Sequence, residues 1–196
     1  TTWADCGTPG VRLMALTVFN GYLLGAGNEG MDRGGVHRYL GDKKWDMAGY
    51  QQGVTQVYAF AAHWGKLYTG TWPEGKVFRD DGAPEWLSVG RLGEEREVMG
   101  MAVYNGKLYS GTLPLAEVYR FDGDDDWTNT GRLDWTPDVT YRRAWSMAVY
   151  KGRLFCGTLP SGHVYALEAG RSATHDRELP AGWRHIAAVR AGGALK

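Results

Sequence analysis

The strongest constraint on the fold of this chain is an internal repeat. One pattern recurs four times: a hydrophobic strand end, a two-residue turn closed by Gly, and a second strand that ends in another Gly. The four copies are Val18–Gly25, Ala62–Gly70, Val103–Gly111 and Val149–Gly157. Their turn glycines Gly21, Gly65, Gly106 and Gly152 are 44, 41 and 46 residues apart. This period is typical of four-stranded units that stack around an axis.

Each hairpin is followed by the marks of a second strand pair. Third strands begin at Val36, Val77, Val118 and Val164, and three units then carry a Trp followed four residues later by Gly. These pairs are Trp45 and Gly49, Trp86 and Gly90, and Trp127 and Gly131. The same element occurs at the N-terminus as Trp3 to Gly7, whereas the fourth unit has Ala173 at the Trp position.

The first strand of each unit alternates small and bulky side chains, which is the period of a β-strand. The small positions are Ala15/Thr17, Ala59/Ala61, Gly100/Ala102 and Ser146/Ala148. Small residues allow sheets to approach near a crowded axis, so the pattern predicts an all-β propeller of four-stranded antiparallel blades with almost no helix. We expect one domain over residues 1–196, with blades at about 11–50, 56–92, 97–133 and 143–180.

Both ends of the chain carry partial blade strands, in residues 1–8 and 184–196. If Trp3–Gly7 pairs beside Ile186–Arg190, the termini close a last blade within the chain. Otherwise open blade edges favour association, here with further copies of the chain as a homo-oligomer. A third interpretation is that the sequence is a fragment of a longer protein.

The repeat resembles the kelch-type propeller blade, with Gly after the second strand, an aromatic residue in the third and Trp in the fourth. It departs from that pattern where kelch repeats have Gly-Gly, because this chain has Gly70-Thr71, Gly111-Thr112 and Gly157-Thr158. Residues 182–196 are similar to a stretch of laminin G-like, concanavalin-type domains. That resemblance implies an extracellular or cell-surface protein, with a cytoplasmic location left open.

Composition excludes several classes of function. The 22 basic and 22 acidic residues balance, so no field attracts nucleic acid, and no apolar run approaches the length of a membrane span. Cys6 and Cys156 lack metal-ligand spacing, and the acidic run Asp122–Asp126 lacks the order of a calcium loop and is interpreted as a solvated turn. We therefore expect no metal, no cofactor and no catalytic motif.

Residues that depart from the repeat in the loops are the candidates for ligand binding, because packing does not require them. The candidate set is Asn28, Glu29, Trp72, Glu74, Trp135, Tyr141 and Arg142. Aromatic faces beside polar groups suit sugar rings, so the leading hypothesis is a non-catalytic, lectin-like propeller that binds a glycan. A protein-interaction scaffold is the second hypothesis. A fragment of a sialidase-type glycoside hydrolase, which needs paired carboxylates, is the third.

Overall fold

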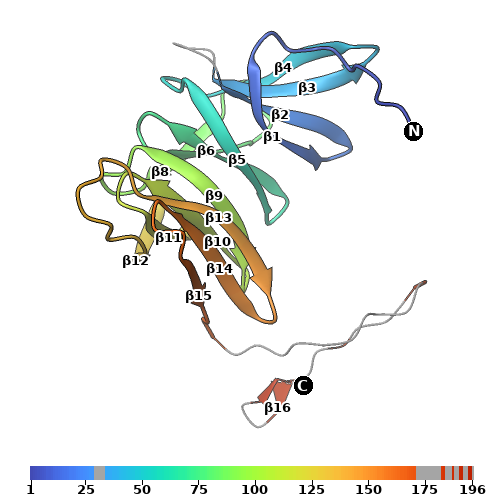
Figure 1. Ribbon diagram of the computed structural model, residues 1–196. Coiled ribbons are helices and arrows are strands. Elements are labelled where there is room, and N and C mark those ends of the chain that lie inside the picture. The colour runs from blue at the N-terminus through green and yellow to red at the C-terminus, as the bar shows by residue number, and fades with distance from the viewer. Residues whose placement is uncertain (29–33, 171–181, 184–186, 188–189, 192–193, 196) are drawn as a thin grey trace.

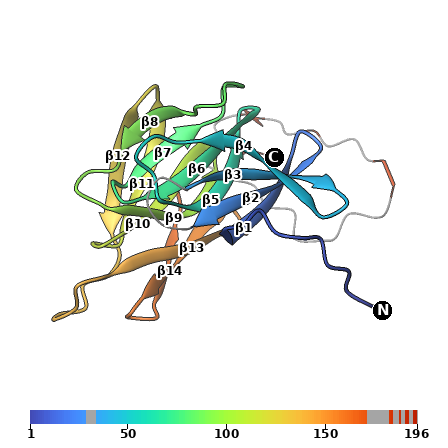
Figure 2. The same cartoon turned by 90° about the horizontal axis from the view of Figure 1, so that it is seen from above.

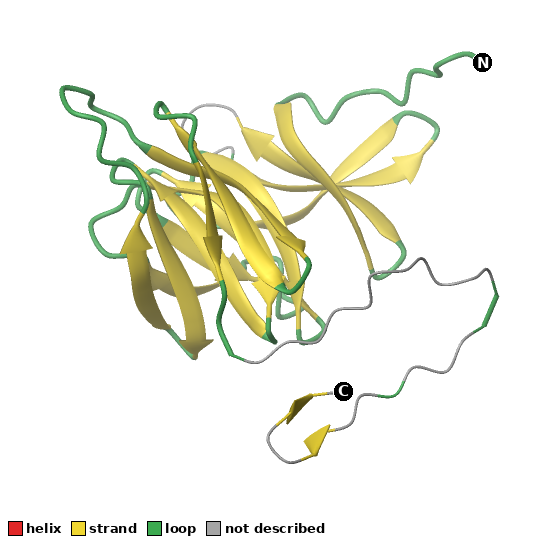
Figure 3. Cartoon of the chain, turned by 60° about the horizontal axis from the view of Figure 1, so that its bottom comes forward, coloured by secondary structure: helices red, strands yellow, loops and turns green. Residues whose placement is uncertain are grey.

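The computed structural model describes residues 1–28, 34–170, 182–183, 187, 190–191 and 194–195. Every regular element among them is a β-strand, as Figure 3 shows, so the expected all-β class is confirmed. None of the described residues belongs to a helix of the length and apolar character that crossing a bilayer requires.

Successive hairpins form four antiparallel units of three or four strands, which we call sheets and number in chain order, although strand pairing joins the first two into one continuous eight-stranded sheet. The first contains β1 (Arg12–Phe19), β2 (Tyr22–Asn28), β3 (Gly35–Gly41) and β4 (Lys44–Tyr50). The second contains β5 (Gln56–His63), β6 (Lys66–Trp72), β7 (Lys76–Arg79) and β8 (Leu87–Arg91). The third contains β9 (Glu97–Tyr104), β10 (Lys107–Leu113), β11 (Glu117–Gly123) and β12 (Asp126–Arg132). The fourth contains β13 (Arg143–Tyr150), β14 (Arg153–Leu159) and β15 (Val164–Leu167), and a separate pair joins β16 (Arg190–Ala191) to β17 (Ala194–Leu195).

The sheets follow one another along a curve, as Figure 1 and Figure 2 show. The strands β1, β5, β9 and β13, which we call the inner strands, lie in contact in that order. The first two sheets are also joined by one pairing, between Asn28 of β2 and Gln56 of β5. All four inner strands begin at the same end of the molecule, since Asn28 pairs with the first residues of both β1 and β5, and the first residues of β5, β9 and β13 border one hollow.

Three clusters of buried side chains lie between successive sheets and form the core. Their members include Leu24, Val57 and Trp86 between the first and second sheets, Val77, Val98 and Leu108 between the second and third, and Tyr109, Ala144 and Leu154 between the third and fourth. Burial of this apolar surface contributes about 25 cal/mol per Å². Each sheet is thus stabilised mainly by its neighbours.

The Trp-to-Gly element interlocks neighbouring sheets. A Cβ on Gly90 would collide with the Trp127 indole and with the carbonyl of Asp125, and a Cβ on Gly49 would collide with Trp86. The indole of Trp127 also donates a hydrogen bond across the gap, to the carbonyl of Val89. The glycine therefore leaves room for the Trp of the next unit.

The expected strand at Trp3–Gly7 does not form, since residues 1–11 contain no strand. Side-chain contacts hold this segment instead: the Trp45 indole donates to the Cys6 carbonyl at 3.0 Å, and Lys43 pairs with Asp5 at 2.8 Å. A β-strand needs a partner strand that pairs with it along its length, whereas these contacts hold the segment only at Asp5 and Cys6. In the proposed pairing with Ile186–Arg190, positions 186, 188 and 189 lie outside the described residues. Position 173 and residues 171–180 of the expected fourth blade also lie outside them.

Candidate functional site

A polar residue begins every inner strand. These residues are Arg12, Gln56, Glu97 and Arg143. The next position of each strand is apolar, and three of its four residues, Val57, Val98 and Ala144, are fully buried. Because packing between sheets repeats from unit to unit, a position that stays polar while its residue type changes between units serves another purpose than packing.

Hydrogen bonds connect the start of β1 to the start of β5. The Arg12 Nε donates to the Asn28 carbonyl at 3.2 Å, and the Asn28 Nδ2 donates to the Gln56 Oε1 at 3.5 Å. The Tyr58 hydroxyl donates to the same Gln56 oxygen. Asn28 is 6% exposed, so this network fixes the amides of two neighbouring sheets in one orientation.

Glu97 places a buried carboxyl beside this network, with 6% of the residue exposed. Burial raises the pKa of Glu97, and the nearby Tyr58 hydroxyl and the charge of Arg143 offset part of that rise. Burial and the Glu97 charge raise the pKa of Tyr58 to about 12. Glu97 and Arg143 do not form an ion pair, since no pair of their charged atoms lies within 4.0 Å.

These side chains border one hollow, which we call the inner-strand cavity. Its volume is about 230 Å³, and its lining is Gln56, Tyr58, Trp72, Glu97, Leu113, Tyr141 and Arg143. Two cations stack on its aromatic walls: the Arg96 guanidinium lies 4.9 Å from the Trp72 ring centroid, and the Arg143 guanidinium lies 5.7 Å from the Tyr141 centroid. Such contacts hold a flat ring in place.

Buried carboxylates fix the loops around the cavity. Glu95, in the loop before β9, accepts the backbone N–H of Leu115 at 3.0 Å, and Asp134, in the loop before β13, accepts that of Ser161 at 3.1 Å. Leu115 and Ser161 each follow the proline after a second strand, so one clamp occurs in two units. Burial opposes ionisation of Asp134, but hydrogen bonds from Thr136 and Ser161 hold its pKa well below the usual range. The loops around the cavity are therefore held by hydrogen bonds within the protein.

Of the candidates predicted from the sequence, the structure brings three to this site. Trp72 and Tyr141 line the cavity, and Asn28 supports Gln56 from behind. Arg142 does not line the cavity, because its Nε donates to the Thr136 carbonyl at 2.7 Å and its backbone N–H to the Pro114 carbonyl. Its neighbour Arg143 begins the strand and lines the cavity in its place.

The remaining candidates lie elsewhere. Glu74 pairs with Lys76 at the surface, and its carbonyl accepts a hydrogen bond from the Arg91 Nε. Trp135 is 70% exposed and is covered on one face by the Arg132 guanidinium, 4.1 Å from the ring centroid. Glu29 lies outside the described residues.

The candidate set predicted from the sequence did not include Gln56, Tyr58, Glu97 or Arg143. The search was confined to expected loops, whereas Gln56, Tyr58 and Glu97 belong to strands. Arg143 was assigned to a loop between units, and Arg142 was chosen instead. Alignment of the four inner strands would have found Gln56, Glu97 and Arg143, since the first position of these strands remains polar while its residue type changes between units.

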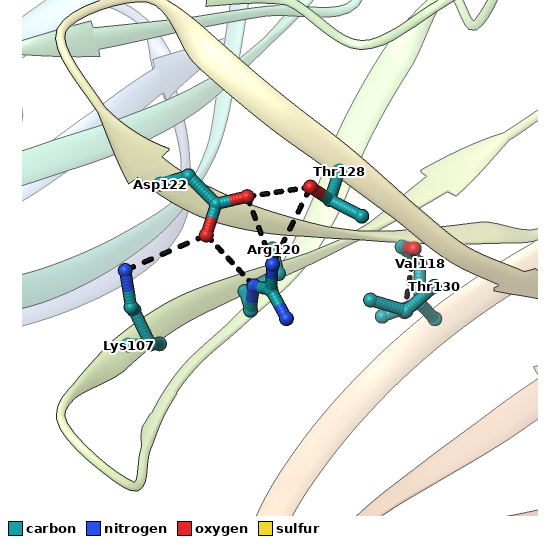
Figure 4. Close-up of polar contacts among 6 residues, drawn as sticks. All are labelled: Lys107, Val118, Arg120, Asp122, Thr128 and Thr130. Carbon is teal, nitrogen blue, oxygen red and sulfur yellow. Dashed lines mark hydrogen bonds and ion pairs between the residues drawn. The ribbon is translucent and has the colours of Figure 1, made fainter. Parts of the chain in front are cut away.

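The acidic run Asp122–Asp126 carries a different kind of interaction. Figure 4 shows the Asp122 carboxylate between Arg120, Lys107 and Thr128, with the Arg120 Nε at 2.8 Å and the Lys107 Nζ at 3.4 Å. The Arg120 guanidinium holds the pKa of Asp122 well below its usual range. Arg38 and Arg79 occupy the same repeat position and also pair with Asp, so an Arg–Asp ion pair recurs with the repeat. Nowhere among the described side chains do three potential metal ligands gather.

An apolar groove between the third and fourth sheets is a second hollow, of about 140 Å³. It is lined by residues such as Val118, Leu154, Cys156 and Tyr165. These side chains continue the core cluster of the third and fourth sheets. The groove therefore belongs to packing between the sheets, and its chemistry differs from that of the polar inner-strand cavity.

The arrangement of sheets defines an all-β, propeller-like protein. Comparison with protein-family models and with curated proteins finds no match. Among solved structures, the chain is similar to a catalytically inactive variant of virginiamycin B lyase from Staphylococcus aureus, determined with quinupristin. The two are 12% identical with a TM-score of 0.54, and the match covers 84% of this chain and 58% of that one. At this identity the likeness shows the fold alone, and the chain spans little more than half of its neighbour's length.

Proposed function

We propose that this chain is a propeller of four kelch-like blades whose inner-strand cavity binds a carbohydrate. The observation that carries the proposal is the pairing of aromatic walls, Trp72 and Tyr141, with the polar groups of Gln56, Glu97 and Arg143 in one hollow. The flat apolar face of a pyranose stacks on such rings, and its hydroxyls bond to amide, carboxyl and guanidinium groups. We place the protein outside the cell or at its surface.

This cavity favours a glycan over the other hypotheses drawn from the sequence. A protein scaffold favours a flat exposed patch, whereas these aromatic residues border a hollow. A glycosidase needs two carboxyl groups on either side of the scissile bond, and the cavity lining contains one carboxyl, that of Glu97.

Acid–base catalysis is a second candidate, supported by Glu97 alone. A buried carboxyl with a raised pKa beside a tyrosine hydroxyl is suited to accept a proton from a bound substrate. The similar solved structure is named a lyase. Release of product from glycans that bind to the protein, and its loss in Glu97→Gln, would favour this candidate over simple binding.

The test is a glycan array probed with the wild type and two tryptophan variants. Trp72→Ala removes a cavity wall worth on the order of 1 kcal/mol of stacking, so binding should weaken about fivefold. Trp135→Ala is the matched control, because this ring lies outside the cavity, and it should bind like the wild type. Trp72→Phe keeps a ring and should retain part of the affinity.

Melting temperatures measured beside the array separate binding from folding. The proposal fails if the wild type binds no glycan. It also fails if Trp72→Ala and Trp135→Ala weaken binding equally, since the site would then lie elsewhere.

A further inference from the structure

We propose that the sugar bound in the inner-strand cavity carries a carboxylate, as a uronic acid does, and that the Arg143 guanidinium receives it. This inference rests on the proposed function and adds the chemical class of the sugar. It is carried by the distribution of charge and of unused hydrogen-bond donors around the cavity.

Among the described residues, guanidinium groups outnumber carboxyl groups at the walls of the cavity, while the carboxylates of Glu95 and Asp134 are bound to backbone N–H groups of the surrounding loops. Three guanidinium groups lie in or beside the cavity: Arg143 in the lining, Arg96 over Trp72, and Arg12 at the start of the neighbouring inner strand. The single carboxyl in the lining, Glu97, is the one whose ionisation burial opposes. A neutral sugar has no need of this excess, whereas an anionic one is attracted by it.

The donors of these arginines are largely unused. The Arg143 guanidinium has no hydrogen-bond acceptor in the part of the chain that the structure describes, and its contact is with the face of the Tyr141 ring. Arg12 donates from its Nε to the Asn28 carbonyl, and its two terminal nitrogens have no acceptor among the described residues. A partly buried cation without an acceptor is costly, so an anion that supplies one is favoured.

Geometry selects a carboxylate. The guanidinium plane presents two parallel N–H groups that match the two oxygens of a planar carboxylate. Tyr141 stacks against Arg143 and keeps that plane from rotating, and Trp72 offers a ring face within the same cavity. One sugar ring against an aromatic wall with its carboxylate on Arg143 would use both features.

The experiment compares matched ligands by titration calorimetry. We expect an oligogalacturonate to bind at least tenfold more tightly than its methyl ester, which has nearly the same shape without the charge, and affinity for the acid to fall as salt is added. Arg143→Gln should abolish the preference for the acid, and Arg143→Lys should keep part of it. Arg153→Gln is the control of equal charge change, since Arg153 pairs with Glu168 at the surface.

Each other result overturns a defined part of the proposal. Equal binding of acid and ester rejects the carboxylate while the proposed glycan site stands. Tighter binding of a sulfated oligosaccharide than of the uronate also rejects it. Acid binding that Arg143→Gln leaves unchanged places the anion at another site, and absence of binding to any glycan rejects the proposed function itself.

Discussion

The indole N–H of Trp127 donates a 2.7 Å hydrogen bond to the carbonyl oxygen of Val89, across the gap between the third and second sheets. The next residue, Gly90, has a φ of 109° and leaves the space that the indole fills. One Trp therefore supplies both apolar contact and a polar bond between units that share no strand pairing. The same bond joins Trp45 to Cys6 at the N-terminal end.

Replacement of Gly90 by Ala should lower the free energy of unfolding by more than the backbone strain of a positive φ alone would. The φ of 109° is unfavourable for Ala, and the new Cβ would lie 2.6 Å from the Asp125 carbonyl oxygen. We expect a loss of about 3 kcal/mol, the sum of left-handed strain and overpacking. Gly82→Ala is the control, because Gly82 has a φ of 89° and no atom near its Cβ position. If urea unfolding shows equal losses of unfolding free energy for the two variants, the packing of Trp127 against Gly90 does not contribute as described.

Asp134→Asn should cost about 1–3 kcal/mol of unfolding free energy, because an amide nitrogen replaces one buried oxygen acceptor. The oxygens of Asp134 accept from Thr136 at 2.8 Å and from Ser161 at 3.1 Å. The folded pKa of Asp134 is depressed, so its stabilising contribution is present above the unfolded pKa and is lost as pH falls through the folded one. Asp138→Asn, an exposed change in the same loop, should have little effect. Loss of equal size in both variants would contradict the clamp.

Glu97→Gln should alter how stability depends on pH. Burial raises the folded pKa of this carboxyl, so the native state binds the proton more tightly than the unfolded state does. Its contribution is then fully present below the unfolded pKa and is lost as pH rises through the folded pKa. The variant should gain stability relative to wild type between acidic and neutral pH, as measured by chemical denaturation. The Glu94 side chain is 90% exposed, so Glu94→Gln should show the same dependence of stability on pH as the wild type.

The two cysteines should react at very different rates. Cys6 is exposed, whereas Cys156 is 4% exposed and burial raises its pKa to about 11. Since the thiolate is the nucleophile, a disulfide reagent near pH 8 should label one thiol quickly and the other only on unfolding. Cys6→Ser should remove the fast phase. Rapid labelling that persists in this variant would show that the third and fourth sheets open easily.

The antiparallel hairpins could be predicted because the repeat shows the same turn and strand pattern several times. The turn glycines Gly21, Gly65, Gly106 and Gly152 all have positive φ, and strands flank each of them. The N-terminal Trp3–Gly7 carries the sequence of a fourth strand without forming one. The sequence of this segment is compatible with a strand. A strand forms only where a neighbouring strand is present to pair with it.

The site was predicted only in part. Trp72 and Tyr141 were found because they depart from the repeat in segments expected to be loops, although Trp72 is the last residue of β6, whereas Glu97 and Gln56 lie in strands that were assigned to packing. Arg142 and Arg143 differ by one position, and which one meets the cavity depends on where β13 begins. A sequence pattern locates strand ends to within a few residues, which is too coarse to choose between adjacent side chains.

The placement of the core between sheets has a consequence for how the molecule unfolds. Where each unit is stabilised by the units on either side, cooperativity passes only between nearest neighbours. The second and third sheets have a partner on both faces, while the first and fourth each have one among the described residues. Backbone amides should therefore exchange with solvent earliest in the outer two units and latest in β6 and β10, so that the array frays from its ends inward.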